Sequence, residues 1–191
     1  MKTSIKSVIV ALLIVTAFSC SKEKVSTPSV LNTQSNDDIK VIGQSLRGGI
    51  VFYVDGTGKH GLIVSTTDIG GGNVAWEPGA NIVTGATGTA NGTGSSNTAA
   101  IIAALGSTGN YAALLCANYS VGNFKNWYLP SKDELNLLFA QRNVIGGLSG
   151  SNYWSSSEVS KGKAWDQEFG GGFQFKDVKT FTLLVRAVSS F

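Results

Sequence analysis

The first twenty residues limit what the rest of the chain can become. Lys2 and Lys6 precede an apolar run from Val8 to Val15, and small residues then lead to Cys20. A basic start, a short hydrophobic middle and a small-residue site are typical of a secretory signal, and here the cysteine completes a bacterial lipobox. The run is too short to cross a bilayer, which takes about 20 apolar residues. We therefore predict a signal peptide at 1–19 and a lipidated Cys20.

The remaining chain then has to fold and act outside the cytoplasm. Residues 20–45 are polar and hold few large apolar side chains, so they cannot offset the ordering entropy of a core. We predict that they form a flexible tether. Residues 46–191 are long enough for one domain. The expected location is the cell envelope, at the outer membrane, facing the periplasm or the exterior, with the membrane contacted only through the lipid.

The net charge limits the classes of binding partner, and the cysteine count limits the possible disulfides. Lys2 and Lys6 leave with the signal, so 13 of the 15 basic residues face 12 acidic ones. Nucleic-acid-binding domains carry a clustered basic face, and we expect no nucleic-acid partner. The 24 glycines and the 14% of charged residues suit a loop-rich fold and argue against a helical bundle. With Cys20 lipidated, Cys116 has no disulfide partner. Its apolar surroundings predict a buried, inert thiol.

Strand signals open the domain, helical signals occupy its middle, and strand signals return at its end. Asp55-Gly56 between two β-rich runs is typical of a hairpin, and Gly170–Gly172 suits a tight turn. The order predicts an α+β fold with an N-terminal β-hairpin, central helices and a C-terminal antiparallel β-meander. The expected elements are strands at 49–54 and 61–65, an extended segment at 75–76, a loop at 84–96, helices at 97–105 (with Asn97 as N-cap) and 111–119, a helix after Ser131, and strands at 153–157, 164–169, 173–175 and 183–188.

The clearest local pattern is the sequence Leu-Pro-Ser at 129–131 with Glu134 three residues later. Ser131 can accept a hydrogen bond from the amide of Glu134 while the Glu134 carboxylate reaches back, which is a capping box. A lone carboxylate could also serve as a general acid or base, but that role needs a poised partner. The sequence marks none, so we interpret Glu134 as part of the helix cap.

Six short motifs follow one another in a recognisable order: Gly48–Val54, Lys59–Leu62, Trp127–Leu135, Tyr153–Glu158, Ala164–Trp165 and Val185–Val188. Together they resemble the Lcl C-terminal domain family, which occurs at the C-termini of bacterial collagen-like adhesins and in exported lipoproteins. The capped helix followed by tryptophan-bearing strands is also similar to the C-type-lectin-like fold that formylglycine-generating enzymes share. The resemblance implies an α+β, lectin-like scaffold for surface binding, without a defined ligand.

Tryptophans are the residues that bear most on a ligand. Indole faces stack on sugar rings, so exposed tryptophans in an exported β-rich domain would suggest carbohydrate binding. We favour core packing for each of them, because all lie in motifs that look structural: Trp76, Trp127, Trp154 and Trp165.

Alternation along 164–169 places Trp165 and Phe169 on one strand face. If that face meets the core, Asp166 and Glu168 are solvated. Arg186 lies between apolar residues, and we expect it to be half-buried and paired structurally with a carboxylate.

The expected ligand-binding face is the C-terminal β region with its turns, since loops on a rigid scaffold often carry recognition. A solvated face without a ligand is the alternative. The candidate residues are Glu158, Lys161, Lys163, Asp166, Glu168, Gln174 and Lys176.

Catalytic and metal-binding patterns are weak. His60 is the single histidine, and we interpret it as a turn residue, because a histidine-based metal site needs several. No Gly-x-Ser-x-Gly motif occurs, and the glycine-rich stretch 85–94 lacks the Gly-Lys-Ser/Thr of a phosphate loop. The aspartates form no regular calcium loop, although lectin-like folds can gather calcium ligands from distant loops. We therefore predict no metal and no cofactor.

Three functions are consistent with these patterns. The favoured one is a non-catalytic, lipid-anchored binding module that recognises a glycan or a surface protein. The second is a structural envelope or fimbrial subunit that assembles through edge strands. The third is an enzyme similar to formylglycine-generating enzymes. That family binds copper through paired cysteines, and only Cys116 is left in the domain, so we expect no enzymatic activity.

Overall fold

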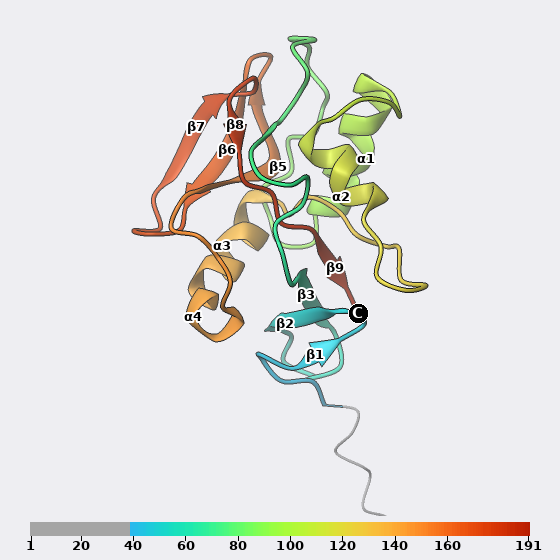
Figure 1. Ribbon diagram of the computed structural model, residues 1–191, viewed down its shortest axis with the longest axis vertical. Coiled ribbons are helices and arrows are strands. Elements are labelled where there is room, and N and C mark those ends of the chain that lie inside the picture. Colours follow the sequence, from blue (N-terminus) through green and yellow to red (C-terminus); the bar gives the residue numbers. More distant parts are fainter. Residues whose placement is uncertain (1–38) are drawn as a thin grey trace, which may run out of the picture. The chain divides into compact units, whose positions relative to one another are not determined.

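Helices and antiparallel strands are mixed along the chain, so the fold is α+β (Figure 1). The computed structural model describes residues 39–191. The expected signal peptide, the lipidation site Cys20 and the tether up to residue 38 lie outside the described residues. Within the described range, no helix is both long and apolar enough to cross a membrane.

The first sheet joins the beginning and the end of the described chain. Its strand order is β1-β2-β3-β9, and all neighbours are antiparallel. The predicted hairpin is confirmed, and the Asp55 side chain accepts a hydrogen bond from the Thr57 amide (3.0 Å) in its turn. Lys40 already donates its amide to the Gly58 carbonyl, so pairing with the hairpin starts before residue 46. The strands are β1 (Ser45–Leu46), β2 (Gly49–Val54), β3 (Gly61–Ser65) and β9 (Val188–Ser190).

Both faces of β3 are buried, because helical layers cover the sheet on either side. Ile63 packs into a core cluster with residues of α1 and α2, whereas Val64 packs with Leu135 and Leu138 of α3. Side chains alternate along a strand, so neighbouring residues enter different cores. The helices are α1 (Gly94–Leu105), α2 (Ala112–Asn118), α3 (Lys132–Ala140) and α4 (Arg142–Ile145).

The start of α1 differs from the prediction. The helix begins at Gly94, and Asn97 lies inside it as a buried residue rather than as the N-cap. The Asn97 side chain holds the preceding loop instead, accepting from the Gly88 amide (3.1 Å) and donating to the Gly88 carbonyl (2.6 Å). A Cβ atom at Gly94 would collide with the Glu134 carboxylate, so the helix starts at the residue that allows this close approach.

The predicted capping box at α3 is confirmed. Glu134 donates its amide to Ser131 Oγ (3.3 Å), and its carboxylate accepts the Ser131 amide (2.8 Å). The buried carboxylate also accepts the Gly92 amide (2.8 Å), so it anchors the glycine-rich loop as well as the helix. Burial raises the pKa of Glu134, and these backbone hydrogen bonds act against that rise.

The second large sheet is the expected β-meander, with order β5-β6-β7. Gly172 donates its amide to the Glu168 carbonyl (2.9 Å), which confirms the tight turn at 170–172. The prediction of one strand at 183–188 is wrong, because this segment divides between two sheets: β8 pairs with β4, and β9 pairs with β3. The strands are β4 (Val74–Ala75), β5 (Asn152–Ser160), β6 (Lys163–Glu168), β7 (Gln174–Val178) and β8 (Thr182–Leu183).

An irregularity in β5 fastens the loops to this sheet. The pairing register with β6 shifts between Trp154 and Glu158. Within this bulge the Ser156 amide donates to Pro130 (2.7 Å) and the Glu158 amide to Ala86 (2.7 Å). A bulge frees backbone N–H groups from pairing with the neighbouring strand. Here the freed amides of Ser156 and Glu158 attach the start of α3 and the glycine-rich loop to β5.

Candidate functional site

Three of the four tryptophans belong to the core, as predicted. Trp76 donates its indole N–H to the Ser155 carbonyl (2.8 Å), and Trp154 donates to the Val74 carbonyl (2.9 Å). Trp127 is buried with an edge-on contact to Tyr119. These rings are unavailable to a ligand.

Trp165 differs from the other three, because it is only partly buried. Phe169 shares its strand face and is covered by Phe139 of α3 and by Tyr153. Phe139 of α3 therefore covers the Phe169 end of this strand face, whereas the Trp165 end stays partly exposed to solvent. The expectation that Trp165 belongs to the core is wrong for this reason.

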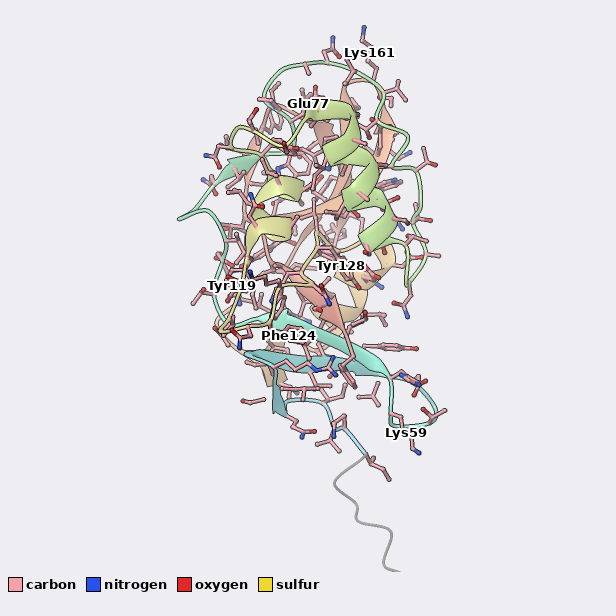
Figure 2. The ribbon with its side chains drawn as sticks, turned by 90° about the vertical axis from the view of Figure 1, so that its right-hand side faces the viewer. Lys59, Glu77, Tyr119, Phe124, Tyr128 and Lys161 are labelled. Carbon is pink, nitrogen blue, oxygen red and sulfur yellow. The ribbon has the colours of Figure 1, made fainter. Side chains whose placement is uncertain are left out.

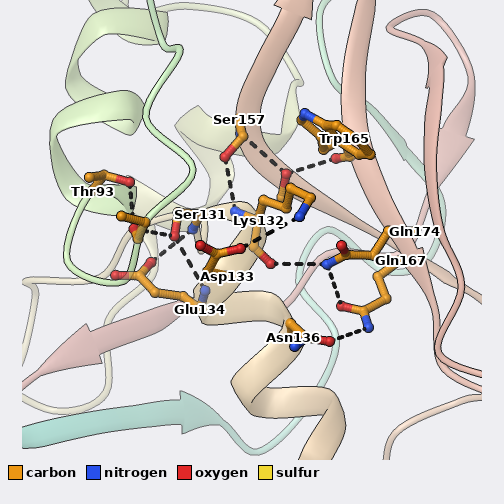
Figure 3. A network of polar contacts seen from close by, with 12 residues as sticks. Thr93, Ser131, Lys132, Asp133, Glu134, Asn136, Ser157, Trp165, Gln167 and Gln174 are labelled. Carbon is orange, nitrogen blue, oxygen red and sulfur yellow. Dashed lines mark hydrogen bonds and ion pairs between the residues drawn. The ribbon is translucent and has the colours of Figure 1, made fainter.

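Two lysines flank the Trp165 ring. The Nζ atoms of Lys132 and Lys176 lie 5.0 and 4.8 Å from the ring centroid, which is the distance of a cation–π contact. Gln174 lies beside them, with its Nε2 3.4 Å from the Lys132 carbonyl and 3.4 Å from Oε1 of Gln167 (Figure 3). We call Lys132, Trp165, Gln174 and Lys176 the Trp165 face.

The backbone below the Trp165 face is fixed by serines of the β5 bulge. Ser155 Oγ donates to the Trp165 carbonyl (2.8 Å), and Ser157 Oγ accepts the Lys132 amide (2.9 Å). The Ser157 hydroxyl in turn donates to Gly88 (2.7 Å). A backbone held by such a supporting layer keeps its position before a ligand arrives, which lowers the entropic cost of binding.

Positive charge dominates the surroundings of Trp165. Lys163 is exposed and, two residues before Trp165 on β6, lies on the same strand face. The nearby carboxylate of Asp133 forms a half-exposed ion pair with Lys132 at 3.6 Å. An exposed indole beside lysines can stack on an apolar ring face and attract an acidic substituent.

The seven predicted binding residues do not form one face. Gln174 and Lys176 belong to the Trp165 face, Lys163 is exposed on the same strand face, and Lys161 is exposed in the turn between β5 and β6. Glu168 accepts the amides of Gly170 (2.8 Å) and Gly171 (2.6 Å), so it closes the β6–β7 turn. The expected surface position is wrong for the two remaining residues, because both are buried: Glu158 and Asp166.

Glu158 belongs to a buried ion cluster. Its Oε1 lies 2.6 Å from Nζ of Lys179, and Oε2 of Glu77 lies 3.8 Å from the same Nζ. All three side chains are about 1% exposed. Burial pushes the pKa of Glu158 upward, but hydrogen bonds from Lys179, Thr84 and Gly85 outweigh it and lower the pKa. We call Glu77, Glu158 and Lys179 the Lys179 cluster.

Asp166 is 1% exposed and faces away from Trp165. Its Oδ2 accepts the side-chain amide of Asn152 (2.7 Å), while Oδ1 has no hydrogen-bond partner among the described residues. Burial, followed by repulsion from the Asp177 carboxylate, raises the pKa of Asp166 from 3.8 to about 6, against the opposing effect of the Asn152 bond. At neutral pH the fold therefore holds a poorly compensated negative charge.

We expect Asp166→Asn to raise the free energy of unfolding at pH 7 by about 2 kcal/mol, since the raised pKa means that ionised Asp166 opposes folding. The unfolded carboxyl titrates near 3.8 and the folded one near 6, so the native state binds more protons between these values. Wild-type stability should fall from pH 4 to pH 6, and the variant should lose the Asp166 part of this slope.

Urea unfolding at several pH values measures both effects. Asp133→Asn, at a half-exposed position, is the matched control and should leave the slope in place. Equal slopes in the wild type and in Asp166→Asn would contradict the assignment of this titration to Asp166.

The remaining chemical candidates have structural positions. Cys116 is fully buried, and burial raises the pKa of its thiol, in agreement with an inert cysteine. His60 is exposed, and its carbonyl accepts the Asp55 amide (2.8 Å) at the hairpin. Among residues 39–191, no three His, Cys, Asp or Glu side chains come close enough together to hold a metal ion. Arg186 pairs with Asp68 at 2.5 Å, as predicted, but it is buried rather than half-buried.

Comparison with known proteins adds no family assignment. No protein-family model matches the chain, and no curated protein is significantly similar to it in sequence.

The sequence patterns do not mark Lys132, which the capping box places at the first position of α3, far along the chain from the Trp165 ring that it contacts. They also miss Lys179 and Glu77. No local signal marks these residues, because their partners come from distant segments.

Proposed function

We propose that the protein is a non-catalytic glycan-binding module of the cell envelope, anchored through lipidated Cys20. The observation that carries this proposal is the partly exposed Trp165 with the ammonium groups of Lys132 and Lys176 at 5.0 and 4.8 Å from its ring centroid. The indole stacks on a sugar ring, and the lysines bind hydroxyl or acidic groups of the same glycan. The resemblance to the Lcl C-terminal domain family and to C-type-lectin-like folds supports a surface-binding role.

The test is binding of the purified full chain to an array of neutral and acidic glycans. We expect Trp165→Ala to weaken binding at least tenfold, or about 1.4 kcal/mol, through loss of stacking. Phe175→Ala is the matched control: this ring is also exposed, but it lies on the opposite strand face and should not affect binding. Lys176→Ala should weaken acidic glycans selectively, with a loss that shrinks at high salt.

A different result would change the assignment. If the folded wild type binds no glycan, or if Trp165→Ala binds as well as the wild type, the Trp165 face is not a glycan site.

One observation favours a second candidate, a structural subunit. Strand β7 is the outer strand of its sheet, and Phe173, Phe175 and Phe181 around it are 67%, 44% and 51% exposed. Apolar edge strands promote pairing between chains. Filaments in electron micrographs of the wild type, together with no glycan binding, would favour this candidate.

A further inference from the structure

The Lys179 cluster has no part in the proposed binding site, yet its geometry suits a chemical reaction. Glu77 lies at the end of the described structure where Lys161 also lies, opposite the hairpin residue Lys59 (Figure 2). The cluster holds one ammonium group and two carboxylates at about 1% exposure. Such an arrangement is costly as a set of ions, because burial removes the hydration of every charge.

The surroundings of the amine shield it from water and hold it against the Glu158 carboxyl group. The Trp76 ring covers Lys179, with Nζ 4.5 Å from the ring centroid, and the Ile82 carbonyl accepts one N–H at 2.9 Å. Away from water, an ammonium–carboxylate pair loses much of its advantage over the neutral amine and the carboxylic acid. Proton transfer across the 2.6 Å contact from Lys179 to Glu158 Oε1 produces that neutral pair.

The carboxyl group of Glu158 is held as an acyl acceptor. Its Oε2 accepts the backbone amides of Gly85 (3.0 Å) and Thr84 (3.1 Å), and the Thr84 amide is shared with Oε1 (2.9 Å). Attack on Cδ would place negative charge on this oxygen, and paired backbone N–H groups stabilise such an oxyanion. The nucleophile is already in contact with the carboxyl group, and such preorganisation replaces a bimolecular encounter.

Glu77 supplies a second carboxylate at the reacting atoms. The Asn81 amide fixes its Oε1 at 2.8 Å, while Oε2 has no hydrogen-bond partner among the described residues and lies 3.8 Å from Lys179 Nζ. A buried carboxylate oxygen in this position can accept a proton from the attacking amine.

We propose that Lys179 and Glu158 condense to an intramolecular isopeptide bond, with Glu77 carrying the proton. The neutral Nζ attacks Cδ of Glu158, and Oε2 becomes the oxyanion. Glu77 takes a proton from the nitrogen and passes it to the protonated Oε1. The Cδ–Oε1 bond then breaks, water leaves, and the C=O bond to Oε2 re-forms. One ammonium and one carboxylate become one amide and one water, and Glu77 ends as it began.

The bond would join β5 to the segment that follows β7. It closes a covalent loop of residues 158–179, which contains β6, β7 and three members of the Trp165 face, Trp165, Gln174 and Lys176, so these strands could no longer separate fully on unfolding. Cross-links that close loops stabilise mainly by restricting the unfolded chain. The reaction is a single self-modification and turns over no substrate, so it does not depend on the proposed glycan binding.

Peptide mass analysis tests the proposal on the full chain. Trypsin releases Glu158 in peptide 143–161 and, when Lys179 is acylated, releases that lysine uncut in peptide 177–186. The isopeptide joins the two in a branched peptide whose mass is their sum less one water, about 18 Da. We expect the branched peptide to replace the linear 143–161 peptide in the wild type and in Lys59→Met, an exposed matched control.

Two variants define the roles of the residues. Lys179→Met should give no branched peptide, and Glu77→Gln should form it on the order of a hundredfold more slowly, the usual effect of removing a proton carrier. Circular dichroism and unfolding curves establish that Glu77→Gln is folded. Only linear peptides from folded wild type, or branching of Glu77→Gln at the wild-type rate, would overturn the proposal.

Discussion

Replacing Lys179 with methionine is expected to lower the free energy of unfolding by about 3–5 kcal/mol, the cost of removing one partner from a buried ion pair. Methionine fills much of the lysine volume but leaves Glu77 and Glu158 as buried carboxylates without a cation. The Ile82 carbonyl also loses its donor. An isopeptide bond in the wild type would make the loss larger. Urea unfolding of both proteins at pH 7 gives the difference.

A charge-neutral variant separates electrostatics from packing. With Glu77→Gln and Glu158→Gln added to Lys179→Met, no charge is buried, and we expect more than half of the lost stability to return. Replacing a whole buried ion cluster by neutral groups often costs little. A Lys179→Met protein within 1 kcal/mol of the wild type would show that the cluster is not the electrostatic element described above.

Arg186→Leu should also reduce the free energy of unfolding by about 3 kcal/mol or more. The guanidinium is 2% exposed and holds three segments together. Its Nε lies 2.5 Å from Asp68, Nη1 donates to the Ser65 carbonyl (2.7 Å), and Nη2 donates to the Gly147 carbonyl. Leucine leaves the buried Ser65 carbonyl without its donor and removes the partners of the Gly147 carbonyl and the Asp68 carboxylate, and thermal and urea unfolding should report the loss.

Arg47→Leu provides the comparison for this substitution. Arg47 is exposed and lies over the Phe124 ring in a cation–π geometry (5.1 Å), so its loss should change the free energy of unfolding by about 0.5 kcal/mol or less. Arg186→Lys should recover only part of the stability, because an ammonium group cannot reproduce the planar fork of a guanidinium. Equal stabilities of Arg186→Leu and Arg47→Leu would contradict the bridging role.

Local patterns predicted the elements whose causes are local. The Asp55-Gly56 turn, the Ser131–Glu134 capping box and the β-meander all depend on residues within one or two turns of each other, and the structure has them. The prediction of where α1 starts was wrong, because the deciding contact is between Gly94 and Glu134, forty residues apart. No propensity at Asn97 could have revealed it.

The candidate site was predicted only in part, for a related reason. Alternation along β6 correctly separated Trp165 from Asp166, but it cannot tell which strand face is covered. That depends on α3, whose Phe139 covers Phe169 while its first residue, Lys132, leaves Trp165 partly exposed. The partners of Lys179 could not be predicted from the sequence either, because Glu77 lies in a distant loop and Glu158 in a different strand.

The pairing of β9 with β3 determines when the first sheet can be completed during folding. Strand β3 of the N-terminal hairpin keeps an unpaired edge until Val188–Ser190 pairs with it, and more than a hundred residues separate the two strands in the sequence. Contacts between such distant parts of a chain slow folding, because the intervening segment must first be brought round. The first sheet therefore cannot be completed from its N-terminal part alone, and a chain truncated before Val188 would leave the edge of β3 open to chaperones and proteases.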